Sequence, residues 1–372
     1  MDRLADNTNV PAAWFLVGAT AVGKTAVAQH LAERTGAAIL SADAMLVYRG
    51  MDIGTAKPAA VERGHVRYFG LDLAEPDEPF SAGVWLHRVR AEWIAARDLP
   101  GLPAGSPAGN GLLVAGGTGL YVRALTQGLN VPAADPERRK YWQERLAREG
   151  LPGLWRELIA RVPQAGDLLA DPDNPRRVIR ALEHVDSHGA LPAGWRTVPR
   201  PRLVGLHLPR VSLHARILAR VERMFAAGLI EEVQSLRARF PAWGRQSHTS
   251  RSVRTAAQPA EPGKSGVGAD DIVSGDGKPA QAGSCEGLAC TAQQAIGYAE
   301  VCDLLDNRIT RGQAIAQIAA RTRQLAKRQE TWFRHQAEVT WIEITPDEPV
   351  ADMAARVLAA WSEHGPTPIR LS

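Results

Sequence analysis

The chain has few cysteines, no signal peptide and no long apolar run. Its three cysteines are Cys285, Cys290 and Cys302, and their number and uneven spacing exclude a disulfide framework and a cysteine zinc site. The first residues lack the basic start and apolar stretch of a signal peptide, and no segment reaches membrane-spanning length. These absences favour a reducing compartment without a membrane partner, and we expect the protein in the cytoplasm.

The overall charge is mild. Forty-four Lys and Arg against forty Asp and Glu give the 372 residues a net charge of +4, and 45% of them are hydrophobic. That hydrophobic fraction excludes disorder throughout the chain. The small basic excess permits a nucleic-acid partner without requiring one, because its effect depends on how the charges cluster.

One motif stands out near the start of the chain. Two glycines with four residues between them, followed by Lys and Thr, form a P-loop pattern that reads Gly18-Ala19-Thr20-Ala21-Val22-Gly23-Lys24-Thr25. A short apolar run before it and an apolar-periodic segment after it predict the strand, loop and helix that the motif needs. Loop amides and the helix N-terminus favour phosphate, Lys24 neutralises it and Thr25 can hold Mg²⁺. We therefore predict a diphosphate or triphosphate ligand with Mg²⁺ as cofactor; the alternative is a glycine-rich turn that fits by chance.

Two further strand ends are expected beside this loop. A predicted strand at 38–41 ends just before Asp43, and another at 112–115 ends at Gly116-Gly117-Thr118. In an open parallel α/β sheet the carboxyl ends of the strands meet where ligands bind. Asp43 can bind Mg²⁺ through water or accept a proton from a nucleophile, or it can simply cap a helix. Thr118 has the same open choice between substrate contact and helix capping.

The remaining pattern is mostly helical. Apolar periodicity predicts helices over 81–97, 137–148, 153–161, 176–186, 212–239, 313–334 and 350–361, with a strand at 341–344. The helix at 313–334 carries a dense basic side that suits a phosphate backbone, although it can also be a solvated surface. Residues 244–291 are rich in Gly, Ser, Ala, Pro and Gln and predict a disordered inserted loop.

Several stretches together resemble the tRNA dimethylallyltransferase (tRNA isopentenyltransferase) family of bacterial type. They are the P-loop, Ser41-Ala42-Asp43, Tyr48-Arg49-Gly50-Met51-Asp52-Ile53-Gly54-Thr55-Ala56-Lys57-Pro58, Gly116 to Tyr121, Asp135-Pro136, Asn174 to Arg177 with Arg180 to Glu183, Leu213-His214 to Arg220, Ala295 to Tyr298, and Arg323 to Gln329. The resemblance covers about residues 13–345. Ala19, Val22 and Ala44 depart from the usual family residues, which removes two hydroxyls but leaves Lys24, Thr25 and Asp43 in place.

The resemblance implies a fold and a domain organisation. We expect an α/β fold, in which a P-loop NTPase-like parallel sheet core carries a helical tRNA-binding insertion domain. The expected divisions are the first part of the core at 1–135, the helical region at 136–243 with its later helices returning to the core, the inserted loop at 244–291, the C-terminal helices and closing strand at 292–363, and a loose tail at 364–372. A monomer is expected.

The resemblance also implies a reaction. Members of the family transfer a dimethylallyl group from dimethylallyl diphosphate to the N6 amine of the adenosine next to the anticodon of tRNA. Asp43, Thr118 and Arg220 are then the expected catalytic residues, Gly18 to Thr25 hold the diphosphate, and Thr25 holds the metal. The residues expected at the tRNA are Asp43, Ala44, Met45, Leu46, Thr118, Arg139, Arg176, Arg177, Arg180, Gln294, Gly297, Tyr298, Lys327, Arg328, Gln329, Trp332 and Arg334.

Two other functions use some of the same residues. A small-molecule or nucleoside kinase accounts for the P-loop, Asp43 and Mg²⁺, but it leaves the basic helices without a role. A nucleotide-gated RNA-binding protein accounts for the basic helices, but not for a carboxylate placed against the phosphate site.

Overall fold

The computed structural model describes residues 12–78, 80–96, 111–128, 135–169, 171–191, 199–241, 292 and 295–371. The predicted inserted loop at 244–291 and the predicted tRNA contact Gln294 lie outside these residues. In this part of the chain no helix is both long and apolar enough to cross a membrane.

A parallel sheet forms the centre of the described structure. Its strands are β1 (Ala12–Gly18), β2 (Ala38–Ser41), β3 (Tyr68–Phe69), β4 (Leu112–Gly116), β5 (Arg202–His207), β6 (Glu338–Glu343) and β7 (Thr367–Pro368). The order is β3-β2-β4-β1-β5-β6 with every pair parallel, and β7 pairs antiparallel with the start of β1. The central strands are almost wholly apolar because helices cover both faces of the sheet, so the predicted α/β class is confirmed.

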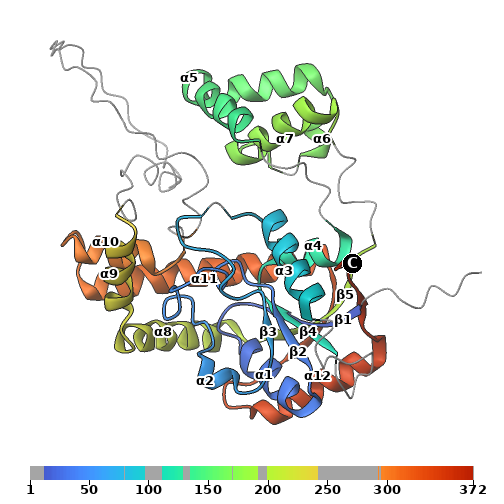
Figure 1. The fold of residues 1–372 in the computed structure, drawn as a ribbon, viewed down its shortest axis with the longest axis vertical. Coiled ribbons are helices and arrows are strands. Elements are labelled where there is room, and N and C mark those ends of the chain that lie inside the picture. The colour runs from blue at the N-terminus through green and yellow to red at the C-terminus, as the bar shows by residue number, and fades with distance from the viewer. Residues whose placement is uncertain are drawn as a thin grey trace, which may run out of the picture.

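The helices form two layers around this sheet (Figure 1). On one face α1 (Lys24–Thr35) packs against α12 (Val350–His364), and on the other α3 (Ala82–Ala96), α4 (Gly119–Gln127) and α11 (Arg311–Gln336) lie together. Beside α11 lie α8 (Arg210–Ala226), α9 (Leu229–Arg239) and α10 (Tyr298–Leu305), whereas α2 (Ala60–Arg63) is a single turn. The chain thus crosses the sheet repeatedly and brings several loops to the carboxyl ends of its strands.

A second, smaller core belongs to three helices that Figure 1 shows as a separate group: α5 (Pro136–Arg161), α6 (Ala165–Leu168) and α7 (Pro175–His188). Proline at the first turn and a capping side chain start both long helices, since Asp135 accepts from the amides of Glu137 and Arg138, and Asn174 accepts from the amide of Arg176. The buried residues are Trp142, Leu154, Leu158, Val162, Ala165, Val178, Ile179, Ala181, Leu182 and Val185. These residues give the insertion its own hydrophobic cluster.

The structure differs from the sequence predictions in three places. The region 136–243 is not wholly helical, because it contains β5, which lies in the central sheet between β1 and β6. The single helix predicted over 212–239 is two helices, since Gly228 adopts φ 100° and ends the helical path before α9. The tail is not loose: β7 pairs with β1, the Arg370 amide donates to the Leu125 carbonyl at 2.7 Å, and Ile369 and Leu371 are buried.

Candidate functional site

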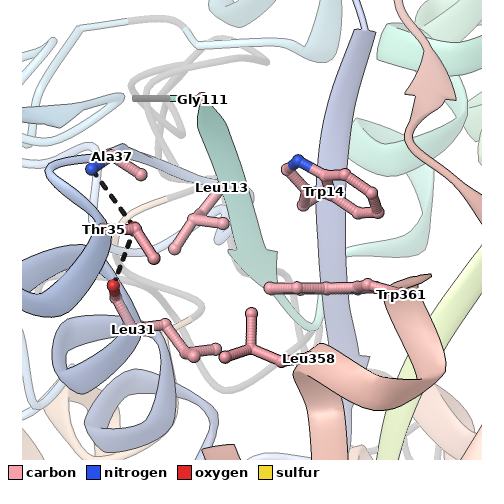
Figure 2. Close-up of a pocket in the computed structure, with 8 residues that line it drawn as sticks. All are labelled: Trp14, Leu31, Thr35, Ala37, Gly111, Leu113, Leu358 and Trp361. Atoms are coloured by element: carbon pink, nitrogen blue, oxygen red, sulfur yellow. Dashed lines mark hydrogen bonds between the residues drawn. The ribbon is translucent and has the colours of Figure 1, made fainter. Parts of the chain in front are cut away.

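Two hollows in the described structure differ sharply in size and character. The smaller, of about 10 Å³, lies between α1, β1, β4 and α12 (Figure 2). Its lining is apolar apart from Thr35, whose hydroxyl already donates to the Leu31 carbonyl at 2.8 Å. A space of that volume holds at most one water molecule. It is a packing gap beneath the Trp14–Trp361 contact, and the functional site lies elsewhere.

The larger hollow is a cleft of about 1080 Å³ at the carboxyl ends of β1, β2 and β4. Its walls come from the P-loop, the segment 43–63, the end of β4, and one side each of α8 and α11. Three arginines of α8, Arg216, Arg220 and Arg223, face it at helical spacing. The cleft is larger than a diphosphate needs and is lined mainly by cations on the α8 side.

The P-loop turn depends on close backbone packing. Gly18 has φ 143°, and a Cβ there would lie 2.6 Å from the carbonyl oxygen of Leu206 on β5. Gly23, with φ 112°, then directs the chain into α1, which starts at Lys24. The amides of the first helical turn therefore point toward the cleft, where an anion is favoured.

Lys24 lies half-buried at the base of the cleft, and its Nζ donates to the carbonyl of Ala19 at 2.7 Å. Burial lowers the pKa of Lys24 to about 8; the Asp43 carboxylate opposes this shift and the Arg220 guanidinium adds to it. The charges of Asp43 and Arg220 therefore act on Lys24.

Asp43 and Thr118 are brought together by the neighbouring strands β2 and β4. The hydroxyl of Thr118 accepts from the amide of Ala44 at 3.0 Å, and the amide of Thr118 donates to the carbonyl of Ala42 at 3.1 Å. The Asp43 carboxylate accepts from the amide of Met45 at 2.9 Å. No helix follows Asp43 in the described chain until α2, so the helix-capping alternative is wrong for Asp43. Thr118 occupies the N-cap position of α4 without a side-chain capping bond.

Arg220 spans the cleft from α8. One Nη donates to the hydroxyl of Thr20 at 3.4 Å, and the other donates to the carbonyl of Thr55 at 2.9 Å. Arg216, one turn earlier, donates to the carbonyl of Val22 at 3.1 Å. Arg216 was not among the predicted site residues, although its spacing of four residues from Arg220 was a usable signal.

The loop that starts at Met51 is held by a carboxylate that the sequence analysis missed. Glu232 of α9 accepts from the amides of Asp52 at 2.9 Å, Ile53 at 2.7 Å and Gly54 at 3.1 Å. The hydroxyl of Tyr298 donates to the same carboxylate at 2.7 Å. A Cβ on Gly54 would lie 2.6 Å from the Tyr298 ring, which explains the glycine.

Tyr298 therefore differs from its predicted role as a tRNA contact. Its side chain is 1% exposed, and burial together with Glu232 raises its pKa well above the usual value, so the phenol remains a donor. Gly297, with φ 107°, begins α10 in front of it. We revise the role of Tyr298 to positioning of the 52–54 loop.

The basic helix α11 presents two different sides. Lys327, Arg328 and Arg334 are exposed, and the guanidinium of Arg334 lies 5.1 Å from the centre of the Trp341 ring. Gln329 points the other way: it is buried and accepts from the amide of Thr20 at 2.7 Å. Gln329 therefore faces the cleft and the P-loop, whereas the other three residues face solvent.

Trp332 lies one turn after the buried glutamine and is half-buried. A Cβ on Gly119 would come within 2.2 Å of its ring, and the guanidinium of Arg123 lies 5.6 Å from the ring centre. The ring is thus packed against α4. Ala44, Met45 and Leu46, expected at the tRNA, are half-buried beside Asp43.

The predicted arginines of the small helical group are of two kinds. Arg139 makes two hydrogen bonds to Glu183, at 2.7 and 3.0 Å, and Arg180 adds a third at 2.7 Å. Burial would raise the pKa of Glu183, but these bonds outweigh burial and hold it below the usual value. Arg176 and Arg177 are exposed, and Arg177 lies 3.8 Å from Asp171.

The parallel sheet, the loop at its carboxyl edge and the adjoining carboxylate define a P-loop α/β protein. Family models separate it from other proteins of that class: a model described as IPP transferase matches residues 46–261 and 276–336, and one described as isopentenyl transferase matches residues 11–72. The chain belongs to the tRNA dimethylallyltransferase family.

Relatives cover most of the chain. A tRNA dimethylallyltransferase of Kineococcus radiotolerans is 36% identical over 362 residues, 94% of this chain and 96% of the relative. One of Bifidobacterium animalis subsp. lactis is 35% identical over 338 residues, 88% of this chain and 81% of the relative. These matches extend over both the sheet core and the helical group.

Solved structures agree with the fold. The full-length tRNA isopentenylpyrophosphate transferase of Bacillus halodurans has a TM-score of 0.54 at 31% identity, covering 95% of this chain and 98% of that one. A eukaryotic dimethylallyltransferase acting on tRNA has a TM-score of 0.64, covering 96% of this chain and 81% of that one. The latter is 17% identical, so its likeness supports the fold alone.

Proposed function

We propose that this chain, an enzyme of the tRNA dimethylallyltransferase family, transfers a dimethylallyl group from dimethylallyl diphosphate to the N6 amine of the adenosine on the 3′ side of the anticodon. The observation that carries the proposal is the juxtaposition in one cleft of a P-loop cation, Lys24, and a carboxylate, Asp43, which interact electrostatically. With tRNA as its substrate, we propose that the enzyme acts in the cytoplasm.

The reaction assigns separate tasks to the two sides of the cleft. The amine nitrogen forms a bond to the first carbon of the dimethylallyl group as that carbon's bond to oxygen breaks, and the electron pair leaves with the diphosphate. Negative charge grows on the leaving oxygen, where Lys24, Arg220 and the loop amides stabilise it. The nitrogen loses a proton, which Asp43 is placed to accept.

Thr118 supports Asp43 in this arrangement. Its hydroxyl and amide fix the backbone on both sides of Asp43, at Ala44 and Ala42. The hydroxyl can also donate its proton to the adenosine, because its bond to Ala44 uses only its acceptor capacity. We propose Thr118 as the residue that aligns carboxylate and acceptor.

The donor atoms fit Mg²⁺. The Thr25 hydroxyl lines the cleft, and the described residues contain no cluster of three or more His, Cys, Asp or Glu that could hold a metal alone. Mg²⁺ commonly takes one or two protein oxygens and completes its shell with phosphate oxygens and water. Bound there, the ion would neutralise charge on the diphosphate.

On the acceptor side, the exposed cations of α11 and of the small helical group can meet tRNA phosphates. Lys327 and Arg328 lie on the α11 surface, and Arg176 and Arg177 begin α7. Such contacts position the tRNA without reading its sequence. We propose these four as primary phosphate contacts.

The test is turnover with dimethylallyl diphosphate and unmodified tRNA by wild type, Asp43→Asn and Asp77→Asn. Asparagine keeps an oxygen for the Met45 amide but cannot take the proton, so kcat should fall by about 10²- to 10⁴-fold while pyrophosphate affinity holds. Asp77 is exposed, and its variant should match wild type. Near-normal turnover of Asp43→Asn would remove Asp43 from the base role, and phosphorylated product with ATP would favour a kinase.

A further inference from the structure

One turn of helix α11 carries both exposed cations and a buried residue that contacts the P-loop. Lys327 and Arg328 are exposed, whereas Gln329, the next residue, is 9% exposed and lines the cleft. Consecutive residues of a helix point about 100° apart. One turn of α11 therefore reaches both solvent and the diphosphate site.

The contact of Gln329 with the P-loop is specific. Its Oε1 accepts from the backbone amide of Thr20 at 2.7 Å. A backbone N–H can only donate, so the side-chain atom that faces it must be oxygen. The same P-loop residue receives Arg220 on its hydroxyl at 3.4 Å. Thr20 is thus held on its backbone from α11 and on its side chain from α8.

The other end of the Gln329 amide meets the turn that carries Thr118. A Cβ on Gly117 would lie 2.2 Å from Nε2 of Gln329 and 3.3 Å from the carbonyl oxygen of Gly18. The Gly117 turn, the P-loop and the glutamine are therefore packed together at one point. Thr118, next in the chain, fixes Ala44 beside Asp43.

We propose that Gln329 is a positioning residue that couples the two substrates: it fixes the P-loop to the Gly117 turn, and through α11 it transmits tRNA binding at Lys327 and Arg328 to the diphosphate site. This inference rests on the proposed function for the identity of the two substrates. Lys327, Arg328 and Gln329 lie on the same turn of α11, so a tRNA phosphate bound at that turn and the Gln329–Thr20 bond share one packed helix. The two substrates then bind cooperatively.

The experiment measures pyrophosphate affinity by calorimetry for the full-length chain, with and without saturating unmodified tRNA. Gln329→Met is close in size but accepts no hydrogen bond, and Gln317→Met is its matched control on the exposed side of α11. In the absence of tRNA, Gln329→Met should bind pyrophosphate roughly fivefold more weakly, the fold-change of one lost neutral hydrogen bond. Gln317→Met should match wild type.

With tRNA present, wild type should bind pyrophosphate more tightly, and Gln329→Met should lose most of that gain while its own tRNA affinity changes little. The opposite pattern, weaker tRNA binding with unchanged pyrophosphate affinity, would overturn the proposal and make Gln329 a direct tRNA contact. If wild type binds pyrophosphate equally tightly with and without tRNA, the coupling is refuted. Thermal melts of both variants detect loss of fold. Because these are binding measurements, they remain interpretable even if prenyl transfer itself is not observed.

Discussion

The charge state of Lys24 predicts how diphosphate binding depends on pH. Burial places the pKa of this ammonium at about 8 in the free protein, against about 10.4 for an unperturbed lysine. At pH 7 about nine tenths of the molecules carry the charge, and at pH 9 about one tenth do. The diphosphate binds the charged form better, so its binding raises this pKa and takes up a proton at higher pH.

Pyrophosphate affinity should therefore weaken as pH rises through about 8, approaching a tenfold loss per pH unit until the pKa of the complex is passed. The assay is calorimetry at intervals from about pH 6.5 to 9.5. Pyrophosphate itself loses protons in this range, and Lys24→Arg corrects for this because a guanidinium stays charged throughout. The ratio of wild-type to variant dissociation constants should rise steeply above the midpoint. If the ratio of the two dissociation constants does not change across this pH range, the charge on Lys24 does not control diphosphate binding.

Three further predictions concern other parts of the structure. Tyr298→Phe removes the donor to Glu232 and should lower the free energy of unfolding in urea by about 1 kcal/mol; weaker tRNA binding instead would restore Tyr298 as a tRNA contact. Replacing Lys327 and Arg328 by Ala should reduce the salt slope of tRNA binding by about 1–2, and equal slopes would show that they are solvated surface charges. Ile369 is 2% exposed, so Ile369→Ala should lower the free energy of unfolding in urea by about 2–5 kcal/mol. An unchanged unfolding midpoint would mean that the tail does not pack against the core.

Local patterns predicted the donor side of the cleft well. The P-loop, the strand before it and the helix after it depend on residues adjacent in sequence, and each formed close to its expected place. The approach of Asp43 to Thr118 was also predictable, because carboxyl ends of neighbouring parallel strands must share an edge. Neighbours in the sequence did not predict which distant residue each polar group hydrogen-bonds.

Glu232 illustrates the difficulty. It lies 178 to 180 residues from the three amides that it accepts from, and nothing in its own helix marks it as more than a surface acid. Gln329 and Tyr298 are polar residues in family-like stretches, which sequence reasoning assigned to tRNA. Polarity alone does not say whether a side chain faces solvent or closes a buried network. β5 was missed for a related reason, since its six residues are too few to break a helical assignment made over a long window.

The arginines of the helical group show that the number of cations in a sequence overstates how many can bind a ligand, because some are already bonded to carboxylates. Arg139 and Arg180 converge on the single buried carboxylate of Glu183, and a phosphate that engaged either one would compete with a hydrogen bond already made. Removing a partner from a buried carboxylate is costly, so Arg139 holds α5 against α7, and Arg180 binds the same carboxylate from within α7. The spacing of three residues between Arg180 and Glu183 was a usable signal. A phosphate can approach the exposed Arg176 and Arg177 without displacing these bonds to Glu183.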